Sequence, residues 1–256
     1  MAFMPAAHLA ELDELARDYW WHAHRAQTVA ALVARFSTST VLSSYIDVGC
    51  GPGATTRIIS DYLSAAGRLA KDAEVAGLDF DPSLAEPCAK HGVKFSVCDL
   101  NAGAVPPLAR RYELFTALDV LEHLKTPERL LGALRPQLTD KALGVIAVPA
   151  FQWLFSDWDR AAGHERRYDE KSLRELLQKS RFEVVWQSYL YSFAMPPAML
   201  RRKVLKTVDA EKKLEFPKVP GWLNAALSAA GSIERLWLKG LPLPFGTTAL
   251  AVVRPV

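Results

Sequence analysis

The sequence has few cysteines, no long hydrophobic run and little net charge. Its three cysteines, Cys50, Cys88 and Cys98, form an odd set without metal-ligand spacing, so we expect reduced thiols of a cytoplasmic protein. The apolar runs stay below the ~18–20 residues of a membrane-spanning helix, and the N-terminus lacks the residue order of a signal peptide. A net charge of +3 over 256 residues is far from that of a dedicated nucleic-acid binder, so nucleic acid is not an expected partner.

The alternation of strand-like and helix-like segments predicts an α/β protein. Half of the residues are apolar, and the chain length suits one large domain. Continuously apolar strands separated by helices indicate a parallel sheet covered on both faces. The predicted strands are 44–49, 74–80, 93–99, 112–120, 142–150, 182–193 and 247–255, and the predicted helices are 6–35, 53–66, 83–91, 126–138 and 170–180.

A glycine-rich turn follows the first predicted strand, in "DVGCGPG". Its spacing, G-x-G-x-G, differs from the G-x-G-x-x-G of dinucleotide-binding proteins, and the Walker Lys and Ser/Thr are absent. Ligands of such sheets bind beyond the carboxyl ends of the strands, where this chain places carboxylates at Asp47, Asp79, Asp99 and Asp119. Carboxylates would repel a pyrophosphate. They favour a cationic ligand rich in hydroxyl and amine donors.

Four motifs, "DVGCGPG", "GLDFDPS", "CDL" and "DVLEHLKTPERLL", occur in an order and spacing that resemble the class I S-adenosylmethionine-dependent methyltransferases. The resemblance covers about Tyr45 to Phe193 and is close to the branch of ubiquinone-pathway O-methyltransferases and other small-molecule enzymes. It implies a Rossmann-like seven-stranded mixed sheet with helices on both faces, an N-terminal helical lid, and a helical insertion before an antiparallel last strand.

The expected organisation is a single methyltransferase domain spanning 1–256. It divides into a lid (1–36), a cofactor-binding core (37–193), a helical cap over the acceptor (194–246) and a final strand (247–256). One departure from the family is "LTDKALG", where relatives have Pro-Gly-Gly; we interpret it as a variant of the loop before the fifth strand.

The resemblance also implies roles in binding S-adenosyl-L-methionine. Asp47 and the turn of Gly49, Cys50, Gly51 and Gly53 would pass under the methionine part. Asp79 would accept hydrogen bonds from the ribose hydroxyls, and Phe80 would pack on adenine. Asp99 would bind the adenine amino group beside the Leu100 backbone. The alternatives are a turn without ligand and, for Asp99, a helix cap.

A second group of residues, Asp119, Glu122, His123 and His164, is predicted to face the acceptor. Helical spacing would place the first three on one face, and "GHERRYD" supplies His164 after the fifth strand. The set resembles the E-x-x-E-H…H metal pattern of small-RNA 2′-O-methyltransferases, with Asp119 in place of the first Glu. It suggests a Mg²⁺, Mn²⁺ or Zn²⁺ site. The alternatives are a metal-free catalytic or orienting role for a histidine and a structural role.

Two further segments have an unusual composition. "DYWWHAHRAQ" (18–27) predicts a lid in which Trp20 and Arg25 close over the cofactor, with Arg25 clamping its carboxylate; the alternative is ordinary helix packing. Basic and apolar residues alternate in 198–213, which suggests a solvated surface helix, a helix lying on anionic lipid at a membrane surface, or a contact with nucleic acid.

The expected reaction is methyl transfer to an oxygen, less readily a nitrogen, of a small apolar or lipid-like acceptor. Two alternatives stay open: an RNA 2′-O-methyltransferase and a non-catalytic adenosylmethionine-binding partner protein. No sequence feature identifies the acceptor or the oligomeric state.

Overall fold

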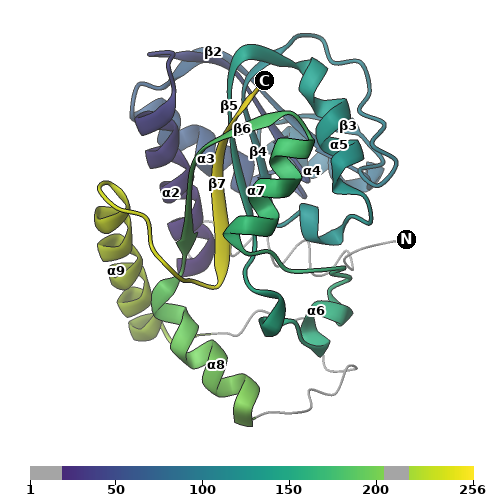
Figure 1. The fold of residues 1–256 in the computed structure, drawn as a ribbon. Coiled ribbons are helices and arrows are strands. Elements are labelled where there is room, and N and C mark those ends of the chain that lie inside the picture. The colour runs from purple at the N-terminus through teal and green to yellow at the C-terminus, as the bar shows by residue number, and fades with distance from the viewer. Residues whose placement is uncertain (1–18, 205–218) are drawn as a thin grey trace.

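A computed structural model describes residues 19–204 and 219–256 of the chain. Seven strands form one sheet in the order β3-β2-β1-β4-β5-β7-β6 (Figure 1). The strand β7 is antiparallel to both of its neighbours, whereas β1 to β5 pair in parallel. The strands are β1 (Leu42–Val48), β2 (Leu69–Asp79), β3 (Lys94–Val97), β4 (Tyr112–Leu118), β5 (Leu138–Pro149), β6 (Phe182–Leu190) and β7 (Thr248–Pro255). The predicted mixed sheet with an antiparallel last strand is confirmed.

Helices cover both faces of this sheet, as predicted. On one face, Val29 and Ile59 belong to the same buried cluster as Tyr45 of β1. On the other face, Leu131 and Leu177 belong to the same buried cluster as Ile46, the next residue of this strand. Neighbouring strand residues point to opposite faces, and all residues of β1 except Ser43 are buried. The helices are α2 (Trp20–Phe36), α3 (Ala54–Ala65), α4 (Ala85–Lys90), α5 (Pro127–Leu134), α6 (Asp157–Ala161), α7 (Glu170–Lys179), α8 (Met195–Val204) and α9 (Gly221–Leu238).

Two strands are longer than the sequence predicted. The strand β2 begins at Leu69 instead of residue 74, because its first half is polar and partly exposed and so lacks the apolar signal. The strand β5 begins at Leu138, so "LTDKALG" belongs to this strand and not to a preceding loop. That interpretation was wrong; the register with β4 shifts between Tyr112 and Leu114, and this irregularity accommodates the polar residues of the segment.

The described part of the predicted lid is α2, which packs on the sheet beside α3; residues 1–18 lie outside the described residues. The helix α9 lies against the outer side of α2 (Figure 1). Their contact includes a buried pair in which His24 Nε2 lies 2.9 Å from Glu234 Oε1. Glu234 also accepts hydrogen bonds from the backbone N–H groups of Tyr191 and Ser192. One carboxylate therefore ties α2, α9 and the end of β6 together.

Within the described ranges, no helix is long and apolar enough to cross a bilayer. The segment 198–213, with its predicted lipid or nucleic-acid contact, falls largely on 205–218 and so outside the described residues.

Candidate cofactor and acceptor site

A cavity of about 400 Å³ lies beyond the carboxyl ends of the central strands. Most residues predicted to form the site line it: Arg25, Asp47, Gly49, Cys50, Gly51, Asp79, Phe80, Asp99, Leu100, Asp119, Glu122, His123 and His164. Two do not, namely Trp20 and Gly53. None of the described residues between 194 and 246 lines the cavity either, so their role as an acceptor cap stays a prediction.

The glycine-rich turn shapes the cavity floor by its backbone. Gly49 has a φ of 71°, and a Cβ there would come within 2.4 Å of Val120 Cγ2. Gly51 has a φ of 53°, and no atom lies within 4 Å of the position that its Cβ would occupy. A side chain at Gly51 would therefore enter open space at the cavity, where a ligand approaches the backbone. Gly53 instead sits at the N-cap of α3 with a φ of 91°, and a Cβ there would lie 3.3 Å from Cys88.

Cys50 belongs to the same turn, and its side chain packs against β2. Its Sγ lies 3.9 Å from Cys88 Sγ, and all three cysteines are free thiols. The Cys50 side chain occupies the space over Gly77 of β2, where a Cβ would lie 2.5 Å from the sulfur. The absence of a side chain in β2 therefore provides the room for this cysteine.

The carboxylates at the first three strand ends are held by short-range hydrogen bonds. Asp47 is buried and accepts from the hydroxyls of Thr56 and Thr116, and its burial raises its pKa to about 6. Asp79 accepts from the backbone N–H groups of Gly51 at 2.9 Å and Phe80 at 2.7 Å. These bonds fix the Asp79 carboxylate at the cavity edge.

Asp99 caps a turn and also lines the cavity. Its Oδ1 accepts from the backbone N–H groups of Asn101 and Ala102 at 3.0 and 3.1 Å, so it organises the turn after β3. The same residue lines the cavity. Capping and ligand contact are therefore compatible at this position.

Arg25 and Asp119 form an ion pair across the cavity. Asp119 follows β4 with a φ of 56°, a conformation uncommon for non-glycine residues. The Arg25 side chain is buried and donates from Nη1 to Asp119 Oδ2. Burial acts to lower the pKa of Arg25, but the Asp119 carboxylate outweighs it and raises this pKa. Because Arg25 already has a carboxylate partner, it is not a vacant clamp for the cofactor.

The first turn of α2 contributes Trp21 and His22 to the cavity rather than Trp20. Successive helical residues point about 100° apart, and Trp20 packs away from the cavity against Tyr191, with ring centroids 5.7 Å apart. Trp21 stacks on Tyr191 at 3.6 Å. The structure therefore places Trp21 at the cavity, and not the predicted Trp20.

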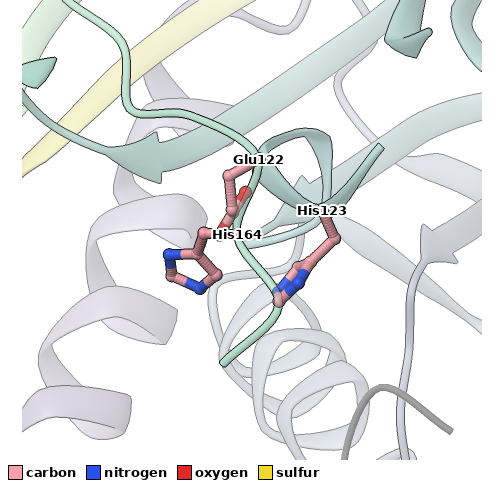
Figure 2. Close-up of side chains that lie close together, drawn as sticks. All are labelled: Glu122, His123 and His164. Carbon is pink, nitrogen blue, oxygen red and sulfur yellow. The ribbon is translucent and has the colours of Figure 1, made fainter. Parts of the chain in front are cut away.

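Glu122, His123 and His164 converge at the acceptor end of the cavity (Figure 2). One ligand atom from each lies within 4.8 Å of the others. The Glu122 side chain is fully buried, and among the described residues neither of its oxygens has a hydrogen-bond partner. Burial, with a further effect of Asp119, raises the Glu122 pKa well above its ordinary value. Burial therefore favours the protonated carboxyl group over the carboxylate.

Asp119 does not join this cluster, which corrects the predicted four-residue metal set. Residues 121–123 form a 3-10 turn instead of starting a regular α-helix, and Asp119 precedes it with a positive φ. The helical spacing that would have put Asp119 on the same face therefore does not apply. Its carboxylate is paired with Arg25 instead.

Asp159 orients His164, and sequence reasoning missed it. The buried Asp159 Oδ1 lies 3.0 Å from His164 Nδ1 and accepts from Arg167 Nε at 2.7 Å. Burial opposes ionisation, but hydrogen bonds and charge from His164 and Arg167 outweigh it and lower the pKa of Asp159. With Nδ1 donating to this carboxylate, Nε2 becomes the basic nitrogen of His164. The signal was the capping pattern Ser156-x-x-Asp159, which marks a short helix just before His164.

His123 completes the acceptor end as a neutral ring. Its ring lies edge-on to that of His164 with centroids 4.6 Å apart. Burial, followed by the nearby His164, lowers the His123 pKa to about 4, so this imidazole is uncharged at neutral pH. One part of the cavity therefore has the fixed carboxylates Asp79 and Asp99, and we call it the adenosine half after its predicted ligand. The other part, which we call the acceptor half, has the neutral His123, the buried Glu122 with its raised pKa, and the oriented His164.

Comparisons with known proteins agree with this geometry. Residues 20–187 match a protein-family model described as a methyltransferase domain. No curated protein matches the chain significantly.

Solved structures share the fold at low sequence identity. A putative methyltransferase from Haloferax volcanii, in complex with the Trm112 methyltransferase activator, has a TM-score of 0.60 at 16% identity, covering 97% of this chain and 94% of its own. A TehB-like S-adenosylmethionine-dependent methyltransferase from Corynebacterium glutamicum has a TM-score of 0.54 at 16% identity, covering 98% and 100%. The [4+2]-cyclase SpnF has a TM-score of 0.55 at 17% identity, covering 90% and 80%.

The family match extends over more than half of the chain, so the chain belongs to this methyltransferase domain family. Together with the class I fold, it identifies the protein as an S-adenosylmethionine-dependent methyltransferase.

Proposed function

We propose that the protein methylates a hydroxyl oxygen of a small acceptor, with His164 as the general base. The observation that carries the proposal is the buried Asp159–His164 pair, which directs the basic Nε2 of His164 to the acceptor half of the cavity. A methyl group transferred to oxygen requires removal of the hydroxyl proton, and an oriented histidine supplies a base of suitable strength. The exposed Trp158, whose ring lies 5.7 Å from His164, offers an apolar surface for the acceptor.

Some residues of the chain bind the cofactor, and others transfer the proton. When bound, the cofactor supplies a methyl group on a positively charged sulfur, and this sulfur keeps the electron pair of the broken C–S bond as the new O–C bond forms. Asp79 and Asp99 bind the ribose and adenine, and Gly51 allows their close approach. His164 takes the hydroxyl proton on Nε2, while the ionised Asp159 stabilises the resulting imidazolium. Such general-base catalysis contributes about 10²–10⁴-fold.

The test replaces His164 by Ala and, as a matched control, His91 by Ala at the end of α4. Turnover is followed as release of the demethylated cofactor with a panel of phenols, aliphatic alcohols and amines. We expect His164→Ala to lower kcat by about 10²–10⁴-fold on a hydroxyl acceptor, with unchanged cofactor affinity. His91→Ala should retain wild-type turnover.

Asp159→Asn tests the orienting role separately. This variant keeps the shape of the side chain but removes the charge that stabilises the imidazolium formed in the reaction, so kcat should fall while cofactor affinity stays unchanged. Methylation of amines only, or of RNA with a strong salt dependence, would contradict the small-molecule O-methyltransferase. Cofactor binding without any turnover would indicate the non-catalytic partner protein.

A second version of the reaction would use a metal ion, and Glu122 is the residue that suggests this version. The residues present fit a cation, because the buried carboxylate without a partner and the two imidazoles lie within 4.8 Å of one another. Two nitrogen ligands favour Zn²⁺ or Mn²⁺ over Mg²⁺, which prefers oxygen. Glu122, His123 and His164 would hold the ion, which would lower the pKa of a bound hydroxyl.

Thermal melting separates the two versions without an acceptor. A metal site predicts that Zn²⁺ or Mn²⁺ raises the melting temperature of the wild type but not of Glu122→Gln, and that a chelator removes both this gain and the activity. A histidine base working alone predicts full activity in the chelator.

A further inference from the structure

The helix α2, which forms one wall of the cavity, is held from its outer side by polar contacts with α9. The Asn224 side chain accepts a hydrogen bond from the backbone N–H of Trp20 at 3.0 Å, so it satisfies the first helical N–H of α2. One turn further along α2, His24 contacts the buried Glu234. No described residue of α9 lines the cavity. A helix outside the cavity therefore fixes the position of a helix that lines it.

The contact between His24 and Glu234 has a defined proton arrangement. Arg235 Nη1 lies 2.7 Å from His24 Nδ1. Because a guanidinium group only donates, His24 Nδ1 accepts, and Nε2 carries the ring proton that points at Glu234. Burial lowers the pKa of His24, which agrees with a neutral ring. Burial acts to raise the pKa of Glu234, but its hydrogen bonds outweigh this effect and keep it a carboxylate.

The same carboxylate holds an unusual backbone conformation at the end of β6. Tyr191 has a φ of 61°, in the left-handed region that is uncommon for non-glycine residues. Glu234 accepts from the backbone N–H of Tyr191 at 2.7 Å, and from the N–H and hydroxyl of Ser192 at 2.7 and 2.6 Å. A conformation of this kind persists only where its surroundings fix it. Glu234 supplies three of the hydrogen bonds that do so.

Tyr191 connects this carboxylate to the cavity through Trp21. The two rings are stacked with centroids 3.6 Å apart, and the Tyr191 hydroxyl donates to the backbone oxygen of Trp21 at 2.6 Å. Tyr191 is fully buried and lies outside the cavity, whereas Trp21 lines it.

Arg25 follows His24 on α2 and also lines the cavity. Burial raises the pKa of Asp47, and the positive charge of Arg25 is one of the effects that limit this rise. The first turns of α2 therefore act electrostatically on the strand end that leads into the glycine-rich turn.

We propose that Glu234 is a positioning residue for cofactor binding. Its contact with Tyr191 holds Trp21 at the cavity, and its contact with His24 holds the turn that carries Arg25. A wall that is fixed before the ligand arrives reduces the free energy of ordering that binding must overcome. The proposal does not depend on which base removes the acceptor proton, or on the chemical nature of the acceptor.

The test measures binding of S-adenosylmethionine and of its demethylated product to Glu234→Gln by calorimetry, without acceptor. Glutamine keeps the size of the side chain, but its amide nitrogen cannot accept a hydrogen bond, so part of the network is lost. We expect both dissociation constants to rise at least about fivefold, as for the ordering of one or two side chains. Hydrogen exchange at residues 20–25 should become faster in the same variant.

The matched control is Glu113→Gln. Glu113 accepts from the N–H and hydroxyl of Ser43 at 2.6 and 2.8 Å, a contact of the same kind as that between Glu234 and Ser192. It lies near the start of β4, at the end of the sheet opposite to the cavity. This control should bind the cofactor like the wild type. An unchanged dissociation constant in Glu234→Gln, or equal rises in the two variants, would overturn the proposal.

Tyr191→Phe tests the connection even if Glu234→Gln does not fold. It keeps the stacked ring and removes only the hydroxyl that binds the Trp21 backbone, so the variant should remain folded. We expect its dissociation constant for the cofactor to rise at least about twofold, the low end for loss of one hydrogen bond. Wild-type affinity in this variant would overturn the connection through Tyr191. Because no turnover is measured, the result is independent of the proposed O-methylation.

Discussion

The adenosine half and the acceptor half of the cavity are built differently. In the adenosine half, Asp79 and Asp99 accept hydrogen bonds from backbone N–H groups that neighbouring turns supply. In the acceptor half, Glu122 lies buried without such donors, and His164 depends on Asp159 for its orientation. The adenosine half presents fixed hydrogen-bond acceptors to a ligand, whereas the acceptor half holds side chains whose protonation state can change.

This difference has an energetic meaning. A carboxylate that is already bonded to N–H groups costs little further free energy when a ligand binds. A buried carboxyl group without partners stays protonated, or requires a cation, because an uncompensated charge in the interior is unfavourable. The adenosine half is therefore suited to binding and the acceptor half to chemistry.

Among the effects on ligand binding and stability, the largest that we expect is on cofactor affinity. Asp79→Ala should weaken binding of adenosylmethionine roughly 10–150-fold, which corresponds to about 1.5–3 kcal/mol for hydrogen bonds to a charged group. Calorimetry measures it, with the exposed Asp140→Ala as control. His164→Ala should leave the same affinity intact. An unchanged dissociation constant in Asp79→Ala would mean that this carboxylate does not hold the ribose.

The acceptor half should make the free energy of unfolding depend on pH. The pKa of Glu122 is raised in the folded protein, so its stabilising contribution is complete below the unfolded pKa of about 4.3 and is lost as pH rises through the folded value. Glu122→Gln removes this loss. In metal-free buffer we expect this variant to gain on the order of 1 kcal/mol over the wild type at alkaline pH, or roughly 2–4 °C in Tm, with less gain near pH 5. A gain that is the same at every pH would rule out a buried titrating carboxyl group.

The smallest effect concerns α2, which borders both halves through Trp21 and Arg25. If the first turn of this helix closes over bound cofactor, its amide hydrogens should exchange severalfold more slowly with adenosylmethionine present, whereas those at the end of α9 should not change. Hydrogen-exchange mass spectrometry provides the comparison. Equal exchange of the first turn in both states would leave α2 as an ordinary packed helix.

The strand-end carboxylates were predictable from the sequence because each one stands at or near the end of a predicted strand. The parallel topology then brings these ends to one edge of the sheet, so no long-range information was needed to place Asp79 or Asp99 at a common cavity. The roles of these residues toward the ligand stay predictions.

The residues of the acceptor half were harder to predict from the sequence. The set was predicted to contain Asp119, but a positive φ and the ion pair with Arg25 turn this residue away. Asp159 was missed because its importance comes from two partners in the next loop, His164 and Arg167. The position of Trp21 in place of Trp20 at the cavity has another cause: in a run of aromatic residues on one helix, periodicity does not decide which ring faces the cavity.

The contact between Cys50 and Gly77 also restricts which substitutions positions 50 and 77 can accept. The sulfur occupies the volume that a side chain at position 77 would need. A larger residue at 77 is therefore tolerated only after position 50 has lost its side chain, and the reverse order would pass through an overpacked, less stable protein. Among homologues, these two positions should vary together: small residues at 50 would accompany alanine or larger residues at 77, and glycine at 77 would accompany cysteine or another side chain at 50.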